Sequence, residues 1–330
     1  MNRHYGIALA LLLLIAAGVS QAPFGFAPFD FAQGKQDKPP ADRFTATFSI
    51  AAYDPATGDL GVAVASKFPA VGAMVPFAKA GVGAVATQAL ANLEYGPKGL
   101  QMMELGLSAS EAMAKLTEND PQRDDRQLGL VDAKGRSAAW TGKSCFQWAG
   151  SVSGENFTAQ GNILTGPEVV QAIAKSFQSS KGSLAERLMA ALEAGDAAGG
   201  DRRGKESAAL LVVRAGAGYG GVTDRWIDLR VDDHPEPVRE LRRLFEVHTL
   251  YFGETKELVP LTPELVKEIQ EVLQRAGFYK GEVIGLYDAA TRKALEDFQG
   301  WENLEMRFRK DDQIDRVVLD HIRQHFGKKK

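Results

Sequence analysis

Paired strands joined by tight turns, each pair followed by helical segments, constrain the fold of this chain more than any other feature. Residues 45–50 alternate polar and apolar side chains, and a turn rich in Asp, Pro and Gly leads into an apolar strand over residues 60–64. The segments 128–131 and 137–140 flank a second turn of this kind. Because short turns join antiparallel strands, we expect an α+β fold, a four-layer αββα sandwich, and not a doubly wound parallel sheet.

Capping residues mark the helices that follow these strands. Ser108 with Glu111, and Ser183 with Glu186, form capping boxes, in which two side chains accept hydrogen bonds from each other's backbone N–H groups. Gly195 is the expected end of the second of these helices. Further predicted elements are a strand over 81–87, a helix from Pro167, strands over 208–213 and 226–231, and a helix over 237–252.

A composition break at residues 253–260 separates this domain, residues 44–253, from a smaller one, residues 254–330. Thr262 and Asp288 are the expected N-caps of two helices in the smaller domain. A third helix is predicted from the apolar face made by Ile314, Val317, Val318 and Ile322. The sequence therefore predicts a small three-helix domain after the sandwich.

The N-terminal segment has the order of charge and apolarity that directs export. Arg3 precedes an uncharged apolar run over residues 6–19, which is shorter than the roughly 20 residues that a membrane-spanning helix needs. We therefore expect a signal peptide over 1–22, with an uncleaved membrane anchor as the alternative, and a periplasmic or extracellular protein. Residues 23–43, biased toward Pro, Phe, Gly and Lys, are expected to form a disordered linker.

Composition narrows the classes of partner and chemistry. The formal net charge of −3 gives no electrostatic basis for a nucleic-acid partner. Cys145 is the only cysteine, so no intramolecular disulfide is expected. Histidines are few, and the adjacent residues Asp232–His234 fit a strand-end cap better than convergence on one ion. Neither a metal nor another cofactor is therefore expected.

Long ordered strings of residues resemble an uncharacterised family of the N-terminal-nucleophile (Ntn) hydrolase superfamily. The strings are residues 47–50, 61–67, 80–88, 160–164, 199–204, 207–210 and 228–234. This resemblance covers about residues 45–250. It implies an αββα fold and hydrolysis of an amide bond, and the family's own substrate is not established.

The C-terminal segment is similar to peptidoglycan-binding domains. The resemblance is carried by Leu273, Gly277, Phe278, Tyr279, Gly281, Gly285, Asp288, Thr291, Ala294, Leu295, Phe298 and Gln299. It implies peptidoglycan or another cell-wall polymer as a partner. Ile284 departs from the pattern, because Asp is common at that position in such domains. A stabilising helical appendage without a ligand is the alternative.

Thr47 is the candidate nucleophile. An Ntn hydrolase attacks with the side chain of its first mature residue and uses that residue's α-amine, with a pKa of about 7.7–8.0, as the base. The hypothesis requires a cut between Ala46 and Thr47 in addition to removal of the signal peptide. Ser49, on the same strand face, and Cys145 are weaker candidates. The alternative for Thr47 is a purely strand-forming role.

Other residues are expected to assist catalysis or to hold a substrate. Lys67, like Lys79, is a candidate for lowering the pKa of a nearby amine or for holding a substrate carboxylate, with a solvated lysine as the alternative. Asn162 is a candidate for donating its amide to an oxyanion, although it also fits a turn. In the turn 201–204, either a guanidinium binds a substrate carboxylate or Asp201 pairs with an arginine to fix the loop. The expected substrate-binding residues are Lys79, Gln88, Asp201, Arg202 and Ser207.

Combined, these features predict an exported Ntn-type amidohydrolase that acts on a small amide or a peptide-like substrate and is tethered to the cell wall by its C-terminal domain. The alternative is a non-catalytic envelope protein that binds peptidoglycan. A homo-oligomer is compatible with either, and the sequence does not define the substrate.

Overall fold

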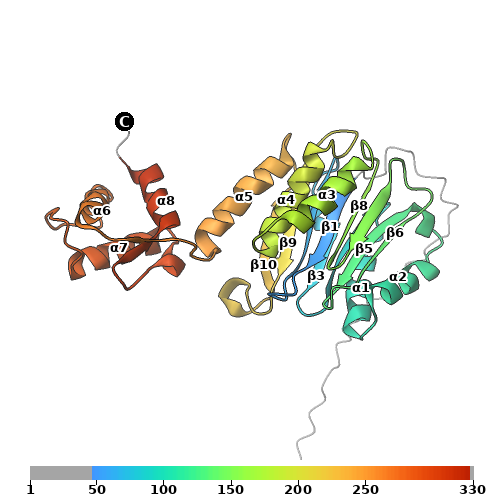
Figure 1. Cartoon of the computed structure of the whole chain (residues 1–330), viewed down its shortest axis with the longest axis horizontal. Helices are drawn as coiled ribbons and strands as arrows, with labels where there is room; N and C mark the ends of the chain where they lie inside the picture. The colour runs from blue at the N-terminus through green and yellow to red at the C-terminus, as the bar shows by residue number, and fades with distance from the viewer. Residues whose placement is uncertain (1–46, 328–330) are drawn as a thin grey trace, which may run out of the picture. The chain divides into compact units, whose positions relative to one another are not determined.

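The computed structural model describes residues 47–327, so the predicted signal peptide (1–22) and linker (23–43) lie outside the described residues. Over this range eight α-helices and three antiparallel β-sheets form a mixed structure (Figure 1), which confirms the predicted α+β class. No helix within residues 47–327 combines the length and the apolar character that a membrane span requires.

A six-stranded sheet places β1 (Thr47–Tyr53) near its centre. The strand order is β10-β9-β2-β1-β8-β7, and every neighbouring pair is antiparallel. β1 and β2 form the first predicted hairpin, whereas the sequence did not predict β7 and β8. The other strands are β2 (Leu60–Ser66), β7 (Gly150–Gly154), β8 (Phe157–Asn162), β9 (Ser207–Val213) and β10 (Arg225–Val231).

A four-stranded sheet lies against one face of the first sheet. Its order is β3-β4-β5-β6, and β5 with β6 is the second predicted hairpin. Between the sheets lies an apolar cluster that includes Val62 and Val64 from the larger sheet and Ala84, Ala86 and Val131 from the smaller one. The strands are β3 (Pro76–Lys79), β4 (Gly83–Ala89), β5 (Arg126–Asp132) and β6 (Ser137–Thr141).

Helices cover the outer face of each sheet (Figure 1). α1 (Tyr95–Glu104) and α2 (Ala109–Glu118) share an apolar cluster with β4 and β5. α3 (Glu168–Ser179), α4 (Leu184–Ala197) and α5 (Pro237–Phe252) pack on the six-stranded sheet. Both predicted capping boxes form, at the first turns of α2 and α4.

Gly195 lies inside α4 and does not end it, so that prediction is wrong. The helix continues to Ala197. A Cβ atom at Gly195 would lie 2.7 Å from the Ile173 side chain and 3.2 Å from that of Phe48. The glycine therefore allows α4 to approach α3 and β1 closely, a role that also selects for a residue without a side chain.

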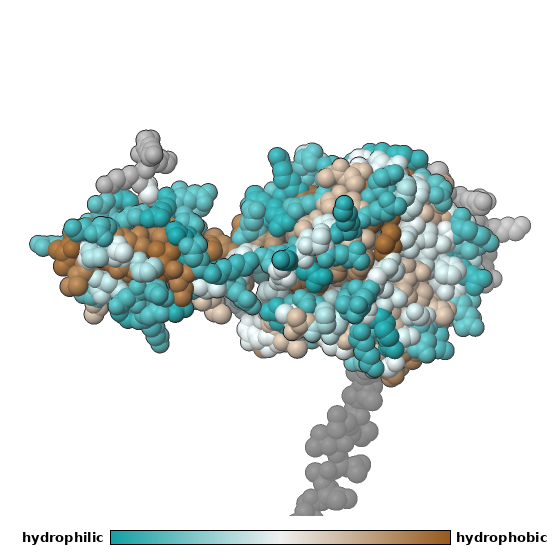
Figure 2. All heavy atoms as spheres, viewed as in Figure 1, coloured by the Kyte–Doolittle hydropathy of each residue, from teal (hydrophilic) through white to brown (hydrophobic). Residues whose placement is uncertain are grey.

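The C-terminal module, residues 258–326, has an apolar cluster of its own that includes Leu273, Phe298 and Ile322. Its helices are α6 (Pro263–Arg275), α7 (Ala289–Trp301) and α8 (Arg316–Phe326), and it also contains β11 (Leu258–Pro260) and β12 (Gln313–Asp315). An apolar area reaches the surface of this module (Figure 2).

The third helix of the module begins later in the chain than the sequence predicts. The predicted N-caps Thr262 and Asp288 are confirmed. Ile314, however, lies in β12 and pairs with Val259 of β11, and α8 begins only at Arg316. The buried side chain of Ile314 belongs to the same apolar cluster as the buried side chains of α8. The apolar pattern therefore runs across the junction of strand and helix.

Candidate functional site

Four polar residues form a row across the six-stranded sheet at the end where β1 begins. Asn162 of β8 pairs with Thr47 of β1, Thr47 pairs with Ser66 of β2, and Ser66 pairs with Ser207 of β9. All four are buried. Because side chains alternate along a strand, they point to the same side as Val62 and Val64, toward the smaller sheet.

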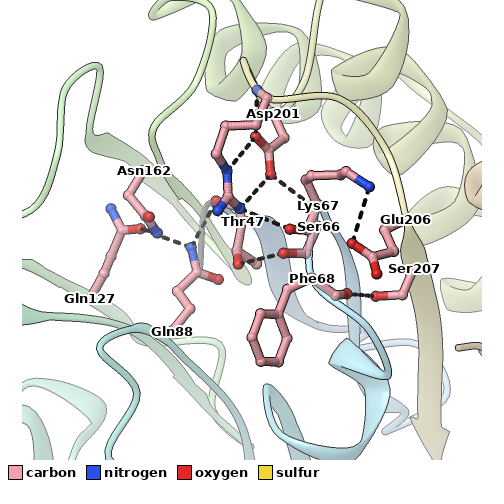
Figure 3. Close-up of polar contacts among 11 residues, drawn as sticks. Thr47, Ser66, Lys67, Phe68, Gln88, Gln127, Asn162, Asp201, Glu206 and Ser207 are labelled. Carbon is pink, nitrogen blue, oxygen red and sulfur yellow. Dashed lines mark hydrogen bonds and ion pairs between the residues drawn. The ribbon is translucent and has the colours of Figure 1, made fainter. Parts of the chain in front are cut away.

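A second polar row faces them from the smaller sheet (Figure 3). Gln88 of β4 and Gln127 of β5 are adjacent in register and are fully buried. The Gln88 amide donates to the Thr47 carbonyl at 3.3 Å and to Gln127 Oε1 at 2.8 Å. Asn162 Nδ2 donates to the same Gln127 oxygen at 2.9 Å. Gln127 therefore joins Asn162 to Gln88, and sequence reasoning missed it.

The hydroxyl of Thr47 lies 3.2 Å from the hydroxyl of Ser66. Asn162 is not a turn residue, because it ends β8 directly beside Thr47. Its Nδ2 group has two N–H bonds and Gln127 takes one of them, which leaves the second as a donor. The hydroxyl proposed as nucleophile and the amide proposed as oxyanion donor are therefore on neighbouring strands.

Ser49, the weaker candidate nucleophile, is held inside the network. Its Oγ donates to Gln88 Oε1 at 2.7 Å and accepts from Gln160 Nε2 at 2.6 Å. The glycine at position 129 makes room for Gln160, since a Cβ atom there would lie 2.1 Å from Gln160 Oε1. Cys145 is buried too, and burial raises the pKa of its thiol to about 11. Neither group suits nucleophilic attack at neutral pH.

Asp201 fixes the loop that borders Thr47. Its carboxylate accepts a hydrogen bond from the Lys67 backbone N–H at 2.7 Å and from the Arg203 backbone N–H at 2.9 Å. It also forms an ion pair of 3.1 Å with the Arg203 guanidinium. The structure thus confirms the interpretation in which Asp201 pairs with an arginine to hold the loop.

The other predicted site residues, namely Lys67, Ser207, Lys79 and Arg202, each have different surroundings. Lys67 Nζ forms an ion pair of 3.2 Å with Glu206 (Figure 3). Ser207 Oγ accepts from the Val71 N–H and donates to the Phe68 carbonyl, so it holds the loop after β2. Two further residues lie outside the polar rows. Lys79 ends β3 opposite Gly83, the first residue of β4, and forms an ion pair with Glu104. Arg202 is exposed.

Three residues other than glycine adopt left-handed backbone angles around the site. Ala89 follows Gln88 with φ of 65°, Ile163 follows Asn162 with φ of 52°, and Ala70 in the loop after β2 has φ of 52°. Such conformations cost on the order of 1–3 kcal/mol each and concentrate at functional sites. Their position at the ends of the strands that carry Gln88 and Asn162 supports a functional role for this end of the domain.

The space beside the site is small. A cavity of about 90 Å³ borders Ser66 and Asp201, whereas ligand pockets usually enclose about 300–1,000 Å³. Within residues 47–327 no group of three or more His, Cys, Asp or Glu side chains is placed to hold a metal ion. His234 instead donates its backbone N–H to the Glu206 carbonyl and accepts from Glu236, which fits the predicted cap.

The domain that carries the polar rows matches one family of proteins over nearly its whole length. The model of a family of unknown function (DUF1028) matches residues 47–241, and the chain belongs to this family. The match begins at Thr47, the first residue of β1. A peptidoglycan-binding domain model matches residues 251–322, which supports cell-wall polymer as a partner.

A solved structure agrees with this assignment. The crystal structure of a protein of the same family from Silicibacter pomeroyi matches with a TM-score of 0.57 and 33% sequence identity, over 62% of this chain and 89% of that chain. No curated protein matches the chain.

Proposed function

We propose that the protein is an exported Ntn-type amidohydrolase with Thr47 as its N-terminal nucleophile. The observation that carries this proposal is the position of Thr47, which opens a central strand beside Asn162, inside two facing rows of buried polar side chains. The family match that begins at Thr47 supports it further. So does the arrangement of two facing sheets with helices outside, which is the one implied by the resemblance to Ntn hydrolases.

The chemistry follows from a free amine at Thr47. After the bond between Ala46 and Thr47 is cut, the neutral amine takes the proton of the Thr47 hydroxyl as Oγ1 attacks the amide carbon. Asn162 donates to the oxygen that becomes negatively charged, and the proton passes from the amine to the leaving nitrogen. An ester to Thr47 remains, and water hydrolyses it to release the acid and restore the hydroxyl.

The same proposal places this chemistry in the cell envelope. A signal peptide over 1–22 directs export, residues 44–253 form the hydrolase domain, and residues 254–330 tether it. The match to a peptidoglycan-binding domain supports wall association. Small amides or peptide-like compounds are the proposed substrate class, because the resemblance to Ntn hydrolases implies hydrolysis of an amide bond.

The N-terminus of the exported protein tests the enzyme proposal. We expect Edman sequencing and intact-mass measurement to give a start at Thr47 for the wild type and for Thr47→Ser. Ser49→Ala serves as the matched control and should start at the same residue. Protein that carries Thr47→Ala and is produced without residues 1–46 should hydrolyse none of a panel of amides. The Thr47→Ser variant should still hydrolyse them.

A non-catalytic envelope protein is the second candidate function. It is favoured by the complete burial of Thr47, whose backbone nitrogen is in a peptide bond with Ala46 before any cut. A sole start near Gln21 or Pro23, with no turnover of any amide tested, would contradict the enzyme and leave wall binding as the function.

A further inference from the structure

The C-terminal module carries a continuous cluster of rings that runs from its core to its surface. Trp301, at the end of α7, is 75% exposed and lies 6.4 Å from the ring centre of Phe278. Phe278 packs edge-on against Phe298, and Phe298 against Phe326. Through Phe326 the cluster reaches His321. A large apolar ring is therefore held at the surface by a rigid base of other rings.

Most of the Trp301 indole is in water and forgoes the favourable burial of its surface, which a bound ligand would supply. Trp is also the side chain most enriched among residues that dominate binding energy, since it offers a large contact area with little conformational entropy to lose. The contact with Phe278 restricts Trp301 further. Trp301 thus has the properties of a binding residue and contributes little to the core of the module.

The residue that follows this ring in the chain belongs to a polar pair. Glu302, the next residue after Trp301, has its carboxylate 3.5 Å from His321 Nε2, and the ring of the exposed His325 lies 4.6 Å from that of His321. A carboxylate accepts hydrogen bonds and an imidazole can donate or accept them. Saccharides present apolar C–H faces bordered by hydroxyl groups. The exposed flat ring of Trp301 matches the apolar face of a saccharide, and Glu302, the next residue in the chain, is a hydrogen-bond acceptor.

We propose that Trp301, supported by Phe278, binds the glycan strand of peptidoglycan. The proposal rests on the wall-binding part of the proposed function and is independent of catalysis at Thr47. Both residues lie within the segment that matches a peptidoglycan-binding domain, residues 251–322. Ile284, Leu286 and Met306 are further exposed apolar residues of the module, and none of them offers a ring.

Cosedimentation of the full chain with purified peptidoglycan tests this surface. Trp301→Ala should weaken binding by about tenfold or more, the loss typical of a dominant interface tryptophan, whereas Trp301→Phe should retain most of it. Ile284→Ser is the matched control, since Ile284 is 53% exposed in the same module, and should bind like the wild type. Circular dichroism should report the same helix content for all three variants.

The outcomes separate this surface from the wall-binding function itself. Wild-type protein that fails to sediment with peptidoglycan would overturn both. If Trp301→Ala binds as strongly as the wild type, or if only Ile284→Ser loses binding, the role of Trp301 is overturned and wall binding by the module still stands. Chitotetraose should quench tryptophan fluorescence of the wild type but not of Trp301→Ala. Competition by a soluble stem peptide, without an effect of chitotetraose, would contradict the choice of glycan.

Discussion

At the scale of single residues, Asp201 determines the shape of the loop beside Thr47. Its side chain is almost fully buried and accepts from two backbone N–H groups and one guanidinium. Asp201→Ala would leave those donors without their acceptor, at a cost of about 2–3 kcal/mol for hydrogen bonds to a charged group. We expect urea denaturation to report that loss of unfolding free energy, and Asp201→Asn to lose less.

The matched control is the exposed pair of Arg309 and Asp311, whose side chains are 35% and 47% exposed. Solvent screens such a pair, so Asp311→Ala should change the unfolding free energy by less than about 0.5 kcal/mol. An equal effect of the two alanine variants would show that burial of Asp201 contributes nothing.

Part of the candidate site could be predicted from the sequence, and the rest could not. Thr47, Asn162 and Asp201 stand out because each is a reactive or capping residue next to a predicted strand or glycine turn. Gln127 and Gln160 do not, since a lone glutamine in a strand normally indicates an exposed face. Their burial arises only because two sheets, formed by distant segments, present polar rows to each other.

At the scale of elements, the composition of β8 explains why it escaped prediction. Its residues alternate between two faces, but the polar face carries Thr158, Gln160 and Asn162 and the other face has only one large apolar side chain, so the apolar signal is weak. β7 is flanked by glycines and carries two serines, which resembles a loop. The hairpins and capped helices were predictable because turn and capping residues act locally, within a few positions.

Two helix glycines give opposite predictions from the same substitution. Ala is favoured over Gly inside a helix by about 1 kcal/mol. At Gly195 this gain is outweighed, because the new methyl group would collide with Ile173 and Phe48, and overpacking typically costs about 1–3 kcal/mol. At Gly300 in α7 nothing lies within 4 Å of the added atom.

We therefore expect Gly195→Ala to lower the unfolding free energy and Gly300→Ala to raise it by about 0.5–1 kcal/mol, as measured by urea denaturation. The pair is its own control, because the chemical change is identical and only the surroundings differ. Stabilisation by Gly195→Ala would mean that α4 can shift away from α3 without loss of packing.

At the scale of the whole described chain, α5 contributes to two apolar clusters. Leu241 and Phe245 belong to the cluster on the six-stranded sheet, whereas Leu250 and Tyr251 pack against that of the C-terminal module. The predicted domain boundary after residue 253 therefore falls just beyond a helix that both clusters use. Composition could not reveal this, because the helix has the same character along its length.

Arg307 completes this connection. Its guanidinium donates to the carbonyls of Thr249 and Leu250 in the last turn of α5 and pairs with Asp315, and both charged side chains are almost fully buried. Arg307→Ala would leave the Asp315 carboxylate buried without its partner, which typically costs about 3–5 kcal/mol. Hydrogen exchange measured by mass spectrometry should then show lost protection in β12 and α8, with β1 and β2 unchanged.

Arg316→Ala, which removes only an exposed pair with Glu257, should leave the exchange of both regions at the wild-type level. Protection in Arg307→Ala equal to that control would mean that α5 and the module are held together by their apolar contacts alone.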